Sequence, residues 1–116
     1  MVDDKLYYVY IIRCIDNSLY TGITTDVARR FSEHTTRRSS GEKYTRSRKP
    51  LSIEAVWKCN GRSNASKLES AIKKLIKPNK EELIKSPCSL SHIIGEGVNA
   101  DLYEYVTGFK DCLTNK

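Results

Sequence analysis

The chain has 116 residues, of which 39% are hydrophobic, so one domain with one core is expected. Its formal net charge is +6 and its pI is about 9.2. No run approaches the roughly 18 apolar residues of a membrane span. The first residues are acidic and lack the apolar stretch of a signal peptide. These features argue against a membrane or secreted protein and predict a cytoplasmic one.

The cysteines are scattered along the chain without a close pair. Structural zinc sites usually show short paired spacings, and these are missing here. We therefore expect buried free thiols in a reducing compartment. The four cysteines are Cys14, Cys59, Cys88 and Cys112.

The N-terminal part of the chain predicts a β-hairpin. Residues 6–14 (LYYVYIIRC) are rich in aromatic and β-branched residues, which is typical of a central strand with two apolar faces. Residues 16–18 (DNS) are turn formers, and residues 19–23 predict the returning strand. Gly22 in this strand permits a close approach of another group to the backbone.

A helix is predicted from Asp26 to Thr35, with Thr24 or Thr25 as its cap. At about 100° per residue, Arg30 and His34 lie one turn apart, at the edge of the apolar stripe. Arg29 lies on the far side. Arg30 is therefore the arginine expected to reach over the sheet.

A basic segment follows this helix. Between residues 29 and 49, eight basic residues stand against two acidic ones, and this excess equals the net charge of +6. Such a patch attracts phosphate, although a solvated loop without a partner has the same composition. The candidate nucleic-acid-binding residues are Gly22, Thr24, Arg29, Arg37, Arg38, Lys43, Tyr44, Arg46, Arg48 and Lys49.

Residues 51–59 (LSIEAVWKC) alternate in the manner of a third strand. An amphipathic helix is predicted over residues 65–77, with Ser63 or Asn64 as its cap and Glu69 at the edge of its apolar stripe. Pro78 suits the first position of a short helix that ends at Lys85.

We expect residues 1–85 to form the domain and residues 86–116 to form a C-terminal extension, helical and packed on it. Asn99 can cap a helix over residues 100–113, although Gly108 weakens that prediction. The apolar face of this helix is a candidate docking site for a protein partner at residues 99–113. Packing on the chain's own core is the commoner use of such a face.

Four residues have the chemistry needed to hydrolyse a phosphodiester. A tyrosine such as Tyr10 or Tyr20 can take a proton from water when its pKa is lowered, and Arg30 can stabilise phosphoryl charge. Magnesium is usually held by one or two carboxylates with waters, so Glu69 can suffice. Taken alone, each has an ordinary structural use; Glu69, for example, is placed to pair with Lys73 one turn on.

The combination resembles the GIY-YIG nuclease superfamily. The matching motifs are Tyr8-Val9-Tyr10, Tyr20-Thr21-Gly22, the helix segment from Asp26 to His34, and Glu69 on a later helix. Residues 42–50 and 68–75 are similar to the small stand-alone bacterial members of the YhbQ type. The resemblance covers about residues 6–83.

This resemblance implies an α+β fold, a three-stranded antiparallel sheet flanked by helices. The extra C-terminal helical segment lies outside the resemblance and is predicted from its periodicity. The resemblance also implies endonucleolytic cleavage with one divalent ion, Mg²⁺ or Mn²⁺, held by Glu69. Tyr10 is then the general base, Tyr20 positions water or phosphate, and Arg30 binds the scissile phosphate. His34 matches a position near the phosphate in many members.

We therefore expect a metal-dependent endonuclease of single-stranded or branched DNA, of the repair or recombination type. DNA is favoured over RNA as the partner. The alternative is a catalytically weak nucleic-acid-binding module or a subunit of a larger nuclease complex, held to phosphate by the basic segment.

Overall fold

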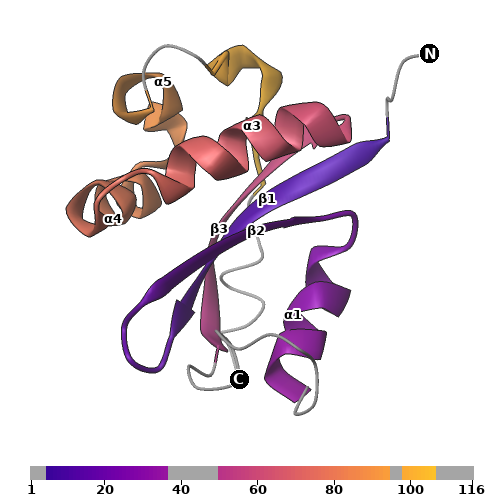
Figure 1. Ribbon diagram of the computed structural model, residues 1–116, viewed down its shortest axis with the longest axis vertical. Helices are drawn as coiled ribbons and strands as arrows, with labels where there is room; N and C mark the ends of the chain where they lie inside the picture. Colours follow the sequence, from indigo (N-terminus) through magenta and orange to yellow (C-terminus); the bar gives the residue numbers. More distant parts are fainter. Residues whose placement is uncertain (1–4, 37–49, 95–97, 107–116) are drawn as a thin grey trace.

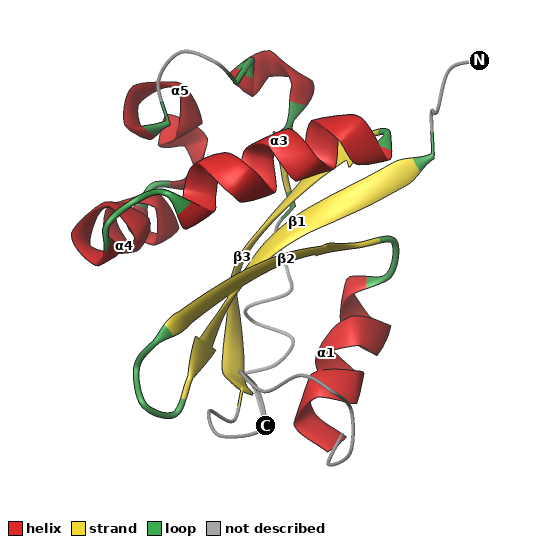
Figure 2. Ribbon diagram, viewed as in Figure 1, coloured by secondary structure: helices red, strands yellow, loops and turns green. Residues whose placement is uncertain are grey.

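The computed structural model describes residues 5–36, 50–94 and 98–106. Helices cover both faces of one antiparallel sheet (Figures 1 and 2). The strand order within the described residues is β2-β1-β3-β4, so β1 is central and β2 forms one edge. The strands are β1 (Leu6–Cys14), β2 (Leu19–Thr24), β3 (Pro50–Asn60) and β4 (Glu104–Tyr105).

The predicted hairpin and its turn are confirmed. Asn17 has a positive φ of 71°, a conformation that asparagine tolerates better than most residues. The backbone N–H of Cys14 donates to the carbonyl of Ser18 at 2.9 Å and closes the turn. The side chain of Asp16 accepts hydrogen bonds from both the backbone N–H and the hydroxyl of Ser18.

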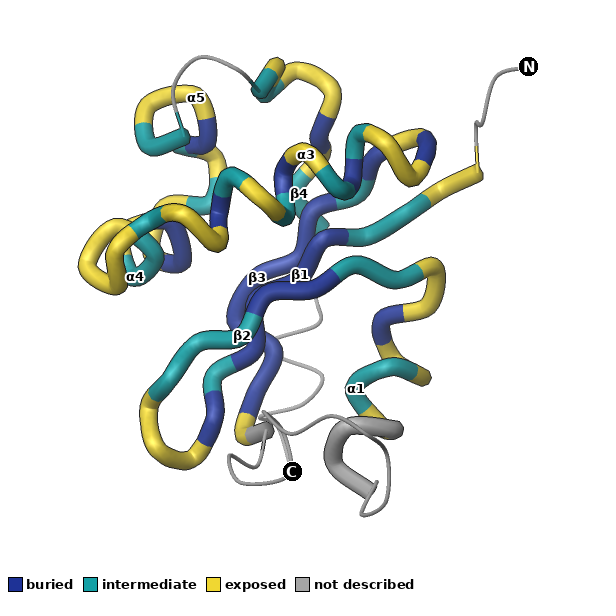
Figure 3. Tube along the Cα trace, in the orientation of Figure 1, coloured by how far each residue is buried: buried dark blue, intermediate teal, exposed yellow. Residues whose placement is uncertain are grey.

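The alternation of β1 divides the core between the two faces of the sheet. Val9 and Ile11 pack toward α3 (Arg62–Lys73), α4 (Lys77–Lys85) and α5 (Leu90–Ile93). Tyr10 and Ile12 pack on the other face, toward α1 (Val27–Thr36). Buried residues follow β1 and β3 through the middle of the molecule (Figure 3). The central strand is therefore apolar on both faces, as its composition predicts.

Two predicted helix caps are wrong. The carboxylate of Asp26 accepts the N–H of Arg29 at 3.1 Å and caps α1, whereas Thr24 accepts the N–H of Asp26 in the preceding turn. The next helix begins at Arg62, before Ser63 and Asn64, and its N-cap is Gly61 with a φ of 86°. The predicted helix over residues 65–77 instead ends at Lys73, and α4 begins at Lys77.

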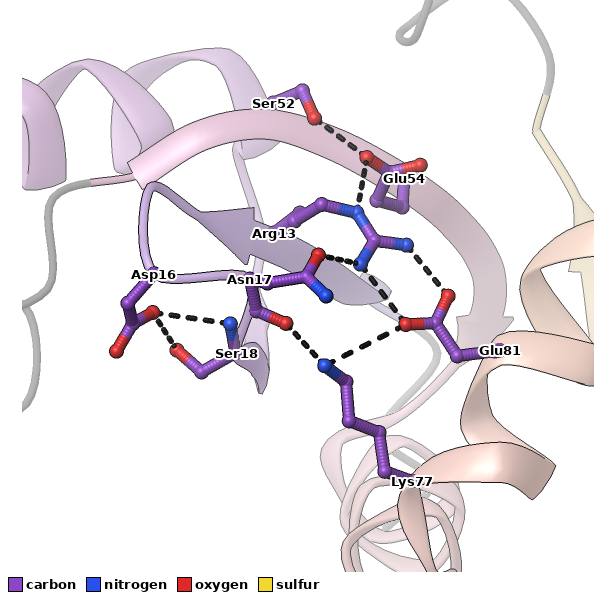
Figure 4. Close-up of polar contacts among 8 residues, drawn as sticks. All are labelled: Arg13, Asp16, Asn17, Ser18, Ser52, Glu54, Lys77 and Glu81. Atoms are coloured by element: carbon purple, nitrogen blue, oxygen red, sulfur yellow. Dashed lines mark hydrogen bonds and ion pairs between the residues drawn. The ribbon is translucent and has the colours of Figure 1, made fainter.

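A partly buried ion-pair network joins the hairpin, β3 and α4 (Figure 4). Between the pairs Ile11–Ala55 and Ile12–Ile53 the register shifts, which leaves Glu54 in a bulge. Arg13 donates to Glu54 at 3.2 Å and forms two bonds to Glu81, at 2.6 and 3.0 Å. The hydrogen bonds that Arg13 donates to Glu81 raise the pKa of Arg13 above its ordinary value and lower the pKa of Glu81.

Replacing Arg13 by alanine is expected to lower the free energy of unfolding by about 2–3 kcal/mol, because Glu54 then stays in the interior without its cation. Since the pKa of Glu81 is lowered from 4.5 on folding, its contribution is present at neutral pH and lost as pH falls through the folded pKa. The free energy of unfolding of the Arg13→Ala variant should lack this acid-sensitive contribution. Urea titrations at pH 7 and pH 4 measure both effects.

Arg29→Ala is the matched control, because the ion pair of Arg29 with Asp26 spans 3.8 Å and the Arg29 side chain is 63% exposed. Such a pair contributes less than about 1 kcal/mol. Equal losses in the two variants would contradict a structural role for the Arg13 network.

The C-terminal segment differs from its prediction. A 3₁₀ helix, η1 (Pro87–Ser89), precedes α5, and a second, η2 (Ala100–Leu102), precedes β4. The helix predicted over residues 100–113 is wrong over residues 103–106, because β4 pairs with β3 and adds a fourth strand to the three predicted. Residues 107–116 lie outside the described residues, and the domain boundary at residue 85 stays a prediction.

Hydrogen bonds tie this segment to the rest of the chain. The indole N–H of Trp57 donates to the carbonyl of Pro87 at 3.2 Å, and the hydroxyl of Tyr103 donates to the carbonyl of Asn64 at 2.6 Å. Burial raises the pKa of Tyr103 to about 12, so the phenol remains a donor. Tyr105 packs against the core, so this part of the candidate docking face is used within the chain.

Cys14 and Cys59 are buried free thiols, as expected, whereas Cys88 is free but exposed. Cys112 lies outside the described residues. None of the helices described is both long enough and apolar enough to cross a membrane.

Candidate nuclease site

The structure brings Tyr10 and Tyr20 together on the face covered by α1. Their ring centroids are 6.3 Å apart and the ring planes meet at 48°, a tilted arrangement that aromatic pairs favour. Tyr20 lies opposite Ile12 in the hairpin register, so its side chain points to the same face as that of Tyr10. Tyr10 is 2% exposed and belongs to the core cluster, while Tyr20 is half-buried.

Gly22 makes room for the phenol of Tyr10. The two residues are cross-strand partners. A Cβ built on Gly22 would lie 2.5 Å from the Tyr10 hydroxyl oxygen and 2.7 Å from Cζ, well inside contact distance. The ring of Tyr10 therefore crosses over the backbone of Gly22, and it carries the hydroxyl from the central strand to the edge strand β2.

The first turns of α1 place Arg30 on this same face of the sheet. Its backbone N–H donates to the carbonyl of Asp26 at 3.0 Å, and its side chain is half-buried. Arg29 is exposed and paired with Asp26. The hydroxyl of Thr24 is engaged with the backbone of Asp26. His34 lies in α1, four residues after Arg30, and only its backbone is described.

Glu69 lies on α3, which covers the opposite face of the sheet from α1 (Figure 1). Its side chain is 23% exposed, and its carboxylate accepts from the Lys73 ammonium at 3.2 Å, the pairing that the helical spacing predicts. Glu69 thus stands apart from the tyrosine pair. The β2 edge is the border of the sheet that lies between the two sets of residues.

The ligands available near Glu69 fit only a divalent ion that is weakly held and keeps most of its water ligands. Over residues 5–36, 50–94 and 98–106, no group of three or more His, Cys, Asp or Glu side chains could hold a metal. Magnesium keeps several waters and needs only one or two carboxylates with substrate phosphate, whereas zinc and calcium need fuller cages. A half-buried carboxylate such as Glu69 meets that smaller requirement.

Seven predicted nucleic-acid-binding residues lie outside the described part of the chain. They are Arg37, Arg38, Lys43, Tyr44, Arg46, Arg48 and Lys49. Sequence reasoning missed two sets of residues that the structure assembles, the Arg13 network and a groove along α3. A signal for the first existed, because Arg13 and Glu54 are charged residues inside otherwise apolar strands of one sheet.

The GIY-YIG catalytic domain family matches residues 6–82 of the chain. This span contains the hairpin with Tyr10 and Tyr20, the helix with Arg30, and Glu69.

The chain is also similar to bacterial UPF0213 proteins, one of which has a solved structure. A UPF0213 protein of Fusobacterium nucleatum is 48% identical over 83 residues, which cover 72% of this chain and 81% of that protein. Another, from Desulfotalea psychrophila, is 46% identical over 84 residues, which cover 72% and 76%. The solution NMR structure of a UPF0213 protein from Bacillus halodurans has 40% identity and a TM-score of 0.45, and the match covers 69% of this chain and 83% of that one. The chain therefore belongs to the GIY-YIG family and carries the catalytic domain of this nuclease superfamily.

Proposed function

We propose that this protein is a divalent-metal-dependent endonuclease that hydrolyses phosphodiester bonds in DNA, single-stranded or branched, in repair or recombination. The observation that carries the proposal is the path of the Tyr10 phenol across Gly22, beside Tyr20, to the edge strand. This path places the hydroxyl of Tyr10 beside Tyr20 and the edge strand, where a substrate strand can approach the sheet.

In this proposal Tyr10 takes the proton from the attacking water, and Tyr20 orients that water or the phosphate. Arg30, on the same face, binds the scissile phosphate and stabilises its developing negative charge. His34, four residues after Arg30 in the sequence of α1, is proposed to assist at the phosphate.

Glu69 has to reach this site from the other face of the sheet. The edge strand β2 is six residues long, and the register places Tyr20, Gly22 and Thr24 on the α1 side. A DNA strand held at this edge has α1 on one flank and α3 on the other. In this proposal the backbone of that strand comes within reach of Arg30 on one flank and of Glu69 on the other.

We propose that Glu69 holds one Mg²⁺ or Mn²⁺. When bound, such an ion supplies positive charge to the phosphoryl oxygens and lowers the pKa of bound water. The ammonium of Lys73 now occupies one side of the Glu69 carboxylate at 3.2 Å. Glu69 therefore has to exchange this partner for the ion, and a partly exposed ion pair of this kind is weak enough to allow it.

The basic residues between positions 29 and 49 are proposed to contact the DNA backbone, in the cytoplasm where that DNA is found. Phosphate contacts give affinity whatever the base sequence. This agrees with a small domain that selects the shape of its substrate, for which single-stranded or branched DNA is the natural choice.

Labelled single-stranded, duplex and branched DNA, with a matched RNA, test the proposal in magnesium, in manganese and in chelator. Cleavage of DNA that requires the metal is expected, and Tyr10→Phe should abolish it. If none of the nucleic acids is cut although all are bound in a salt-sensitive manner, the chain is a binding module or a subunit of a larger nuclease.

A further inference from the structure

We propose that a groove along the outer face of α3 binds the phosphodiester backbone of the nucleic acid beyond the cleaved bond. This extends the proposed function from the site of cleavage to the strand that flanks it. No residue of the groove is among those that the catalytic proposal uses.

The groove has a volume of about 620 Å³ and lies between α3 and the side chains of Ile94 and Val98. One wall is polar and comes from α3. The other is apolar and includes Leu75, Ile94 and Val98. The polar wall consists of Ser63, Ser66, Lys67, Ser70 and Lys74.

The polar wall follows from helical spacing. Ala65, Leu68 and Ile72 form the stripe of α3 that is buried against the sheet, each fully buried. Residues 63, 67, 70 and 74 recur at intervals of three and four, so they align on the opposite side of the helix. A helix that only needed solubility would mix acidic and basic residues there, yet the side chains of α3 that line the groove are serines, lysines and one alanine.

The charge of the groove suits a polyanion. Among the described residues, Lys67 and Lys74 form no ion pair, whereas Lys73 is paired with Glu69 and Lys77 with Glu81. Serine hydroxyls and lysine ammonium groups are common donors to phosphate oxygens. Within residues 62–94 and at Val98, the side chains that line the groove include lysines but no acid.

The groove also lies beside the proposed metal residue. Ser66 precedes Glu69 by three residues, and Ser70 directly follows it. A strand that leaves Glu69 and passes over Ser66 and Ser70 therefore enters the groove within one helical turn, a rise of about 5 Å. Successive phosphates of the strand can then meet Lys67 and Lys74. An acidic protein segment is the competing occupant, and the experiment separates the two.

The test measures binding of a fluorescent 20-nucleotide single strand by the full chain in chelator, as anisotropy over roughly 50–200 mM salt. Lys67→Gln with Lys74→Gln is compared with Lys80→Gln with Lys85→Gln, which removes the same charge from α4. Thermal melts check that both double variants fold. Each lost phosphate contact should reduce the salt slope by about 0.7, so we expect a reduction of about 1.4 and an affinity loss of roughly tenfold for the groove variant alone.

Equal binding by the two double variants would overturn the groove proposal. Fluorescent polyglutamate is titrated in the same way as the acidic competitor, and a groove variant that loses only its binding of polyglutamate would also overturn the proposal. Cleavage in magnesium is recorded separately for the unmodified chain. If the unmodified chain cuts DNA while the groove variant binds like the control, the groove proposal fails and the endonuclease proposal stands. If nothing is cut but the groove variant alone binds weakly, the groove stands as a nucleic-acid site and the endonuclease proposal fails.

Discussion

Replacing Glu69 by glutamine is expected to lower metal-dependent cleavage by roughly 10²–10³-fold, because the isosteric amide cannot neutralise a divalent ion. Affinity for DNA in chelator should be unchanged or slightly higher, since one negative charge near the DNA is removed. Single-turnover cleavage and anisotropy binding measure the two effects. Loss of cleavage with binding retained would assign the Glu69 carboxylate to the metal.

Lys73→Gln is the matched control, since Lys73 holds the carboxylate of Glu69 at 3.2 Å and is itself 54% exposed. If Glu69 serves only in that ion pair, both substitutions should have the same small effects. The free energy of unfolding should fall by less than about 1 kcal/mol, and the cleavage rate should change little. If Glu69 holds the ion, only Glu69→Gln stops cleavage. Full activity of Glu69→Gln would therefore show that the Glu69 carboxylate serves only in its ion pair with Lys73.

The hairpin and its tyrosine pair could be predicted because local patterns determine them. Residues 6–14 read as a strand, residues 16–18 as a turn, and the alternation of side chains then places Tyr10 and Tyr20 on one face. The Glu69–Lys73 ion pair also follows from helical spacing alone. Each of these predictions depends on residues that are neighbours in sequence or lie across one tight turn.

Features that depend on distant residues were not predictable in this way. The bulge at Glu54 arises from the pairing of β1 with β3, and its carboxylate is satisfied by Arg13, 41 residues away in sequence. A helix over residues 100–113 fits the periodicity, but two residues pair with β3 as β4 because sheet hydrogen bonds are available there. Tertiary contacts outweigh local propensity at such positions.

The residues of the candidate site are divided between the two faces of the sheet, which their spacing in the sequence alone does not reveal. A list of motif residues suggests one cluster, whereas the fold puts the tyrosines and Arg30 on one face and Glu69 on the other. Only the three-dimensional arrangement identifies β2 as the edge between them. Gly22 lies on that edge strand under the Tyr10 phenol, so a side chain at this position would displace the ring.

Gly22→Ala is expected to displace the Tyr10 ring. The new Cβ would lie 2.5 Å from the hydroxyl oxygen, 2.7 Å from Cζ and 3.2 Å from Cε1. The ring is 2% exposed and cannot swing into solvent without opening the core. Overpacking of this kind costs about 1–3 kcal/mol in the free energy of unfolding. A shift of about 1 Å in a catalytic group lowers cleavage by about 10²-fold.

Thr21→Val is the control that separates displacement of the ring from general damage to β2. Thr21 neighbours Gly22 but points to the opposite face, is 3% exposed, and has a hydroxyl with no hydrogen-bond partner among the described residues. Valine has the same shape, so stability should be unchanged or higher and cleavage should be retained. Urea denaturation and cleavage rates compare the two variants. If Gly22→Ala keeps both stability and cleavage, the phenol of Tyr10 does not need its path over the edge strand, and its proposed role as the base loses its structural support.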